Sequence, residues 1–247
     1  MFNVPNRTKM KEQITESDIF RQVSEQDIDQ MLRSARSVLH SQGDIIFRMG
    51  DIPRSVYFVI SGSIKIEVPL PTGEMFFIGI CAKNTLFGEH EALCGKFSIA
   101  QAQTLTDAEL IEVPKSHFIE VFNANRMLSQ QLSIRLATNM RSYMLGSAYR
   151  FTNSPDKQLA NLLVYLAKQV EHDKDATSQY KLKLSQEEIA QMLSTSRQTV
   201  NKYLQLLRQQ GWINVRGTEI ELLKIAELKE HAGIITLDKM GEALKKR

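Results

Sequence analysis

Turn signals that recur through residues 37–114 constrain the fold of this chain more than any other feature. They separate short runs rich in β-branched and aromatic residues, at 44–47, 56–60, 64–68 and 75–80. The run at 64–68 alternates apolar and polar residues, as a strand with one buried face does. Turns spaced about every 8–12 residues are typical of a sandwich or barrel of antiparallel strands. The sequence therefore predicts an antiparallel β domain in this segment.

Helical patterns flank the β segment. Residues 24–36 carry apolar residues at helical spacing, and Ser24 is placed to cap this helix. Residues 115–150 are also predicted to be helical. Four apolar residues there are spaced four, four and three apart, close to a heptad seam: Leu132, Leu136, Met140 and Tyr143. Such a stripe fits either a dimer seam or the core of one subunit, and Ile134 and Ala137 form a second apolar face.

The segment 151–155 interrupts the helical pattern, because Ser154 before Pro155 is the signature of a new helix start. We therefore predict three parts: a β domain with its N-terminal helix at 1–125, a long helix at 126–150, and a second domain at 151–247. Within the second domain, 172–179 is predicted to be a polar loop, and apolar residues beyond 232 predict a further helix.

Two short helices joined by a serine-rich turn are predicted in the second domain. Ser185 and Glu188 form a capping box at the start of the first helix. Residues 194–196 form the turn, and a second helix runs from Arg197 to about residue 209. Three apolar residues recur at helical spacing on its inner side: Val200, Leu204 and Leu207.

The opposite face of the second helix carries hydrogen-bonding side chains and no carboxylate: Arg197, Gln198, Asn201, Lys202 and Gln205. In a DNA major groove, Arg and Lys pair with guanine, and Gln and Asn pair with adenine. The same pattern also fits a solvated helix in a small α domain. Residues 212–222 predict a β-hairpin with Gly217 in its turn. A hairpin wing beside the second helix favours DNA binding over the solvated helix.

The overall composition makes any DNA-binding surface a local one. The net charge is only +3, and the hydrophobic share of 43% is that of a globular protein. Two cysteines are too few for a disulfide framework, a zinc site or an iron–sulfur cluster. No nucleophile–base pair or phosphate-binding glycine loop indicates an enzyme, and no cofactor or metal is expected. No apolar run predicts a signal peptide or a membrane span, so a cytoplasmic protein without a membrane partner is expected.

Taken together, these residues resemble the cyclic-AMP receptor protein family of bacterial regulators, which includes the FNR-type oxygen sensors. The resemblance extends over most of the chain and is carried by 43–51, 56–62, 86–89, 105–110 and 184–207. It implies an α+β protein with an N-terminal β jelly-roll sensor domain of the cyclic-nucleotide-binding kind. It further implies a long dimerisation helix and a C-terminal winged helix-turn-helix domain. The implied partners are double-stranded DNA, a second copy of the chain and RNA polymerase.

The resemblance also places an effector site in the β domain. In the family's cyclic-nucleotide binders, a Phe-Gly-Glu motif and a following Arg-Ser pair hold the ligand. Phe87, Gly88 and Glu89 match the motif, but the pair falls on Ser98 and Ile99, which supply no arginine for a cyclic phosphate. The loss of such a charge-assisted contact costs roughly 1.5–3 kcal/mol. We therefore expect cyclic AMP to bind weakly or not at all, and any small-molecule effector to be a different compound.

Several alternatives for the sensor stay open. His90 is a candidate haem ligand, although a lone histidine is more often a surface residue. Cys94 is a candidate redox switch, although the role of a small buried apolar residue is expected. DNA binding without an effector is a further alternative. So is a cyclic-nucleotide-binding module that regulates an enzyme or channel and does not act on DNA.

Seven residues are predicted to form the DNA-binding site: Ser196, Arg197, Gln198, Thr199, Asn201, Lys202 and Arg216. Family members that read the half-site TGTGA carry a glutamate where this chain has Gln198. Gln198 has no carboxylate to accept a hydrogen bond from a cytosine amino group. Its amide favours adenine instead. The operator is therefore expected to be a near-palindrome that departs from the family's usual half-site.

Overall fold

The structure is a computed structural model that describes residues 7–170 and 180–233. The polar loop predicted at 172–179 and the helix predicted beyond 232 fall on residues outside these ranges, apart from residue 233. The chain forms two compact units, residues 1–144 and 145–247. Their boundary falls inside the long helix α5 (Arg126–Thr152). Within the described ranges, no helix has both the length and the apolar character needed to cross a membrane.

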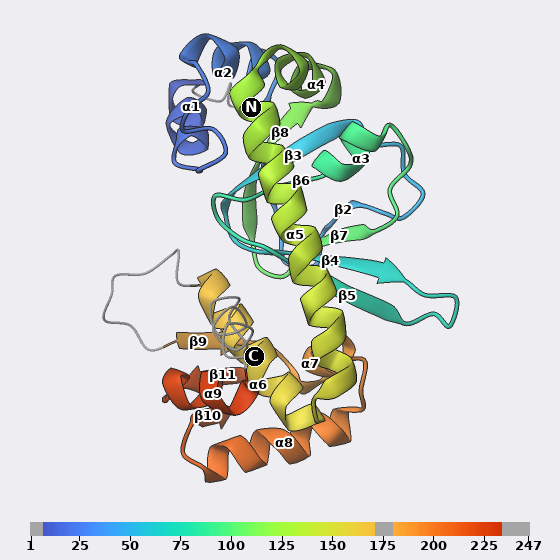
Figure 1. The fold of residues 1–247 in the computed structure, drawn as a ribbon, viewed down its shortest axis with the longest axis vertical. Coiled ribbons are helices and arrows are strands. Elements are labelled where there is room, and N and C mark those ends of the chain that lie inside the picture. The colour runs from blue at the N-terminus through green and yellow to red at the C-terminus, as the bar shows by residue number, and fades with distance from the viewer. Residues whose placement is uncertain (1–6, 171–179, 234–247) are drawn as a thin grey trace, which may run out of the picture. The chain divides into compact units, whose positions relative to one another are not determined.

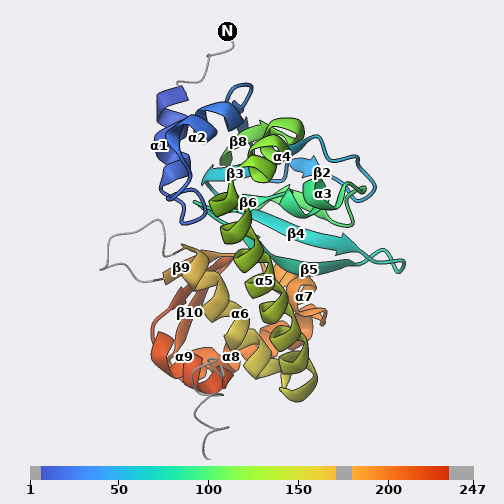
Figure 2. The same cartoon turned by 45° about the horizontal axis from the view of Figure 1, so that its top comes forward.

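Two four-stranded antiparallel sheets make up the centre of the first unit (Figures 1 and 2). In spatial order, the first sheet contains β1 (Arg36–His40), β8 (Ala108–Pro114), β3 (Ser55–Ser61) and β6 (Leu86–Phe87). The second contains β2 (Ile45–Phe47), β7 (Gln101–Thr104), β4 (Ile64–Pro69) and β5 (Met75–Cys81). The four strands predicted from the turn spacing are present as β2 to β5, so the predicted antiparallel β domain is confirmed.

One apolar cluster is shared by strands of both sheets, and it includes Val59, Ile64, Phe87, Ala102 and Leu110. Gly62, in the turn between β3 and β4, lies where no other residue fits. Its φ is +81°, and a Cβ there would collide with the backbone carbonyl of Asp107. The tight approach of this turn to the start of β8 therefore depends on glycine.

A larger core joins the first sheet to helices α1 (Arg7–Thr15), α2 (Glu25–Met31), α4 (Lys115–Ala124) and the start of α5. Ser24 caps α2 as predicted, but the helix ends at Met31 and not near residue 36, because the chain turns there to enter β1. The helical segment predicted at 115–150 is two helices. Asn125 breaks it, since its Oδ1 accepts from the Leu128 N–H at 2.9 Å and thereby caps α5.

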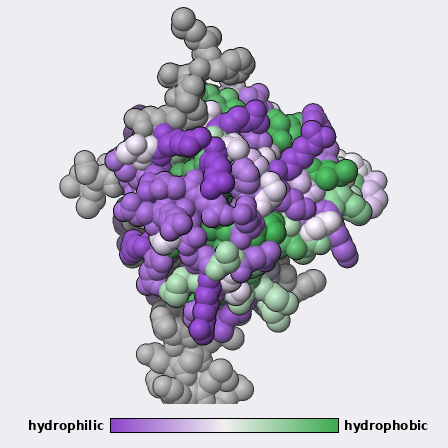
Figure 3. Space-filling model, turned by 90° about the horizontal axis from the view of Figure 1, so that it is seen from above, coloured by the Kyte–Doolittle hydropathy of each residue, from purple (hydrophilic) through white to green (hydrophobic). Residues whose placement is uncertain are grey.

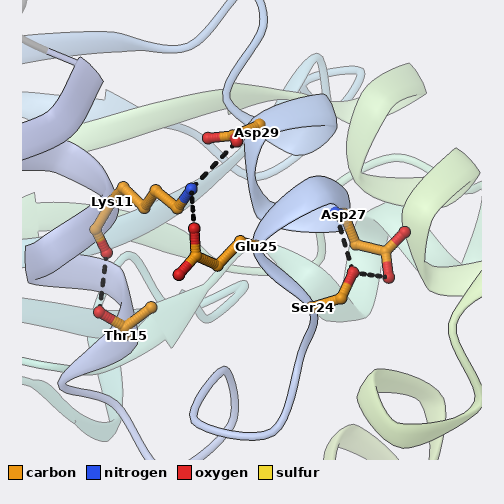
Figure 4. Close-up of polar contacts among 6 residues, drawn as sticks. All are labelled: Lys11, Thr15, Ser24, Glu25, Asp27 and Asp29. Carbon is orange, nitrogen blue, oxygen red and sulfur yellow. Dashed lines mark hydrogen bonds and ion pairs between the residues drawn. The ribbon is translucent and has the colours of Figure 1, made fainter.

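Polar contacts fasten α1 to α2 at the N-terminal end of this unit (Figure 4). The Lys11 ammonium donates to both Glu25 and Asp29, with each N···O distance 3.0 Å. Within α2, Ser24 Oγ accepts from the Asp27 N–H and donates to its carboxylate. Met10 and Ile14 on the other side of α1 are buried in the core. The N-terminal helix is thus held by a buried apolar face and an exposed ionic one.

In the described part of the second unit, four helices follow α5 and pack with a three-stranded antiparallel sheet of order β10-β11-β9. Its elements are α6 (Pro155–Val170), β9 (Tyr180–Lys183), α7 (Gln186–Leu193), α8 (Arg197–Gln209), β10 (Ile213–Arg216), β11 (Glu219–Leu222) and α9 (Ile225–Ala232). Helix α6 begins at Pro155, as predicted. The last helix packs on α6, where His231 Nε2 lies 2.9 Å from a carboxylate oxygen of Asp156.

The surface is mainly hydrophilic on the face drawn in Figure 3, where apolar residues form separate patches. Cys94 is exposed at the end of the short helix α3 (Glu89–Cys94), so the expectation that it is buried is wrong. The helix ends there because Gly95 follows with a φ of +66°. Cys81 is partly buried, and burial raises the pKa of its thiol to about 12.

Candidate nucleic-acid interface and sensor site

Helices α7 and α8 form the predicted helix-turn-helix. Ser185 and Glu188 make a complete capping box, in which each side chain accepts from the backbone N–H of the other residue. Ser194, with a φ of +50°, ends α7 in a left-handed conformation and starts the sharp turn. Ser196 then caps α8 by accepting from the Thr199 N–H at 3.1 Å. These two caps fix where each helix begins and therefore where the side chains of α8 point.

The two sides of α8 differ in exposure. Val200, Leu204 and Leu207 are buried, as predicted. The opposite side is exposed and carries Arg197, Gln198, Asn201, Lys202 and Gln205. No carboxylate occurs in α8. The structure therefore brings four of the predicted DNA-binding residues together on one open face.

Two predicted DNA-binding residues act within the fold. Ser196 Oγ and Thr199 Oγ1 lie 2.8 Å apart at the start of α8, and both belong to its cap.

The Lys202 side chain contacts the next residue of α8, where its ammonium lies 5.3 Å from the centre of the Tyr203 ring. This cation–π contact limits the positions that the Lys202 side chain samples before it meets a ligand.

The predicted wing is the hairpin of β10 and β11. Arg216 ends β10, is exposed, and pairs in register with Glu219 across the turn. Gly217 in that turn has a φ of +61°. The carboxylate of Glu219 forms an ion pair with Lys181 on β9, with an N···O distance of 3.5 Å. Among the described residues, Glu219 thus pairs with Lys181, and no ion pair engages the Arg216 guanidinium.

The Phe-Gly-Glu motif leads from β6 into α3. Phe87 is buried and stacks on Tyr57, with ring centres 5.0 Å apart. Gly88 has a φ of +81°, and a Cβ there would press on the Tyr57 ring and the Ser55 carbonyl, each 3.3 Å away. The motif therefore needs a glycine at this position to bring the start of α3 against β3.

Glu89 is the buried ionisable group of this motif, with 2% of its surface exposed. Its Oε2 has no hydrogen-bond partner among the described residues, and its Oε1 lies 3.4 Å from His90 Nδ1. Burial raises the pKa of Glu89 above its ordinary value, while the charges of His90 and Arg135 act in the opposite direction. An acceptor left open in this way is costly unless a proton or a ligand occupies it.

The other two predicted effector residues face in opposite directions. Ser98 is buried, and its N–H and carbonyl bond to the backbone of Asp51 and Gly50 at 2.9 and 2.7 Å. Ile99 is 65% exposed. Neither residue therefore offers a positive charge to an anion.

The predicted seam on α5 is divided between core and surface. Leu132 is completely buried in the core of the first unit, and Leu136 packs against that core. Met140 and Tyr143 are exposed, at 65% and 48%. Two further apolar residues of α5, Ile134 and Met144, are also exposed, at 53% and 63%. Leu132 thus has no surface left for a partner, whereas Ile134, Met140 and Met144 are exposed to solvent.

Arg135 is a functional candidate that the sequence reasoning missed. It lies on α5, and its Nη2 donates to the Leu86 carbonyl at 2.7 Å, directly before the Phe-Gly-Glu motif. The two residues are 49 positions apart, and no motif surrounds Arg135. Only the folded arrangement places this cation beside residues 86–89, which we call the sensor loop.

Comparisons with known proteins agree with this geometry. The family description "Cyclic nucleotide-binding domain" matches residues 38–125, and "Crp-like helix-turn-helix domain" matches residues 157–231. A CRP-like cAMP-activated global transcriptional regulator from Mycobacterium tuberculosis is 27% identical over 85% of this chain and 94% of its own length. The transcriptional activator protein anr from Pseudomonas aeruginosa is 25% identical over 83% of both chains.

Solved structures show the same fold. A CRP/FNR-family transcriptional regulator from Thermus thermophilus superposes with a TM-score of 0.66 at 22% identity, over 80% of this chain and 98% of that one. The c-di-GMP responsive global regulator CLP of Xanthomonas campestris gives a TM-score of 0.68 at 20% identity, over 81% and 99%.

The fold and its two sites define a DNA-binding transcription regulator, with a cyclic-nucleotide-binding-like domain followed by a winged helix-turn-helix. The predicted α+β architecture is confirmed. The chain belongs to the CRP/FNR family of transcription regulators. Its relatives are regulators and not enzymes. Among the residues that the structure describes, no cluster of His, Cys, Asp and Glu is arranged to hold a metal ion.

Proposed function

We propose that this regulator binds DNA as a homodimer, and that the two α8 helices enter successive major grooves about 34 Å apart. The observation that carries the proposal is the exposed, carboxylate-free face of α8. Arg197, Gln198, Asn201 and Lys202 would contact base edges, and Arg216 on the wing would contact a phosphate. Ser196 and Thr199 support this face through the cap.

The dimer would form through α5. Ile134, Met140 and Met144 are large, apolar and exposed, and a second copy of the same helix would bury them. In this proposal, residues 1–125 act as the sensor, 126–150 as the dimerisation helix and 151–247 as the DNA-binding part. A two-fold symmetric dimer requires an operator with matching symmetry, which is a near-palindrome.

The effector would be a compound other than cyclic AMP. By their names, the M. tuberculosis relative responds to cyclic AMP and the X. campestris regulator responds to cyclic di-GMP. Regulators with this fold therefore differ in their ligand. The position of the family's phosphate-binding arginine is occupied here by Ser98, which is buried and uncharged. The proposal also includes RNA polymerase as a partner and the cytoplasm as the place of action.

Substitutions on the α8 face test the proposal. Arg197→Ala and Lys202→Ala are each expected to weaken operator binding about tenfold or more, because one base contact contributes roughly 1–3 kcal/mol. Fluorescence anisotropy with a labelled operator measures the effect at fixed salt. Lys229→Ala, an exposed lysine of α9, is the matched control and should leave affinity unchanged. Unchanged affinity in both α8 variants would refute the proposal.

A further inference from the structure

A charged donor on α5 holds the backbone of the sensor loop. Arg135 Nη2 lies 2.7 Å from the Leu86 carbonyl oxygen, and Leu86 itself is buried. Guanidinium groups have five N–H donors, which is more than this one bond uses. Arg135 can therefore serve another acceptor nearby without leaving the loop.

Glu89, three residues beyond Leu86, carries an acceptor without a partner in the described part of the chain. Its Oε2 is buried and accepts from no described residue. The charged and titratable groups that act on it are His90 and Glu91 on its own helix, Arg135 on α5, and Cys81 on β5. Of these, Arg135 is the cation from another element, and no ion pair within 4.0 Å joins it to Glu89 in the described structure.

Two arrangements of Arg135 compete as a result. When Glu89 is neutral, or when it accepts from a donor of a ligand, the Arg135 guanidinium is most stable hydrogen-bonded to the Leu86 carbonyl. When Glu89 is ionised and has no other partner, a buried unpaired carboxylate is the larger cost, and pairing with Arg135 relieves it. The arrangement in the structure is the one expected for a neutral or occupied Glu89.

We propose that Arg135 is a positioning residue that exchanges between the Leu86 carbonyl and the Glu89 carboxylate, so that α5 responds to the state of the sensor loop. An effector that keeps Arg135 on Leu86 must present a hydrogen-bond donor, a hydroxyl or an ammonium group, to Glu89. This assigns the regulation of the proposed sensor site. It rests on the proposed function only for the last step, from α5 to DNA.

A double-mutant cycle at several pH values tests the exchange. Unfolding of the full chain is followed by calorimetry for the wild type, Glu89→Gln, Arg135→Gln and the double variant, between about pH 5 and pH 9. Because the pKa of Glu89 is raised, the carboxylate ionises as pH rises through that raised value. The two residues should then be coupled by about tenfold or more in the unfolding constant at high pH, and not at low pH.

Two further variants sharpen the cycle. Arg135→Lys keeps the charge and should retain part of the coupling, whereas Arg141→Gln, an exposed arginine of the same helix, should show none. If Arg135 only holds Leu86, then Arg135→Gln should lower the free energy of unfolding by the same amount in the wild type and in Glu89→Gln, at every pH. That outcome overturns the exchange.

Operator affinity measured across the same pH range tests the step to DNA. In the wild type it should change with pH, and in Arg135→Gln and Glu89→Gln it should be flat. Flat wild-type affinity beside a pH-dependent unfolding cycle would overturn the role of α5 in transmission. Failure of the wild type to bind any operator would instead refute the proposed function, while the unfolding cycle would still decide the exchange.

Discussion

Single side chains decide what this sensor can bind. Ser98 stands where the family resemblance places an arginine, and both of its backbone polar groups are bonded to neighbouring loops. Ser98→Arg is expected to raise cyclic-AMP affinity about tenfold or more, because it restores a charge-assisted contact of roughly 1.5–3 kcal/mol. Titration calorimetry against the wild type measures the gain, and Lys96→Arg on the same loop is the control. Tight cyclic-AMP binding by the wild type would contradict the account.

A second residue-scale feature is the contact that joins the start of α6 to α9. Burial opposes ionisation of Asp156, but hydrogen bonds from Ser154, its own backbone and His231 outweigh burial and lower its pKa. With a lowered folded pKa, ionised Asp156 stabilises the fold above its ordinary value of 3.8, and the contribution is lost as pH falls through the folded value.

Asp156→Asn should therefore lower the free energy of unfolding at neutral pH by about 1–2 kcal/mol, with the difference vanishing in acid. Trp212 is the single tryptophan, and its ring lies 5.1 Å from that of His231, so its fluorescence in urea reports on this contact. Glu230→Gln, an exposed change on α9, is the control. A difference that persists undiminished in acid would mean that the side chain acts by packing alone.

At the scale of elements, local chemistry explains which parts of the structure the sequence could predict. The caps at Ser185 and Ser196 and the period of Val200, Leu204 and Leu207 are local signals, and all of them are confirmed. The sequence places the start of the long helix at residue 126, but the side-chain bonds of Asn125 to Leu128 and to Asp27 of α2 that separate α4 from α5 were not predicted, because Asp27 is distant in the sequence. Arg135 was missed for the same reason, since its partner is distant in the sequence.

Helix α5 shows where periodicity alone is insufficient. A stripe of apolar residues looks the same whether it faces its own domain or a partner, and here Leu132 faces its own domain. Met140 and Tyr143, from the same stripe, are exposed. Exposure, which only the fold reveals, separates the two roles.

Charges placed on the exposed side of α5 should dissociate the dimer. Ile134→Asp combined with Met144→Asp puts four carboxylates into the proposed two-fold interface, and is expected to raise the dimer dissociation constant about 100-fold or more. Sedimentation velocity measures the change. Leu39→Asp, at an exposed apolar residue on β1, is the matched control. A variant that remains dimeric would place the interface elsewhere.

At the scale of the whole molecule, regulation requires two compact units that respond to each other. Their boundary lies within one continuous helix, at residues 144 and 145. An effector changes DNA binding only if its affinity differs between the two states of the protein. In our proposal, the sensor loop, Arg135 and α5 produce such a difference, and α8 carries the surface whose DNA affinity changes.

The most direct test of the central claim is a selection of operator sequences from random DNA with the purified full chain. We predict a near-palindrome with half-sites about one helical turn apart, a guanine contacted by Arg197 and an adenine preference at Gln198. The same selection with Arg197→Ala should lose that guanine. Enrichment of no sequence, or an enriched site that the Arg197 variant recovers unchanged, would contradict base reading by α8.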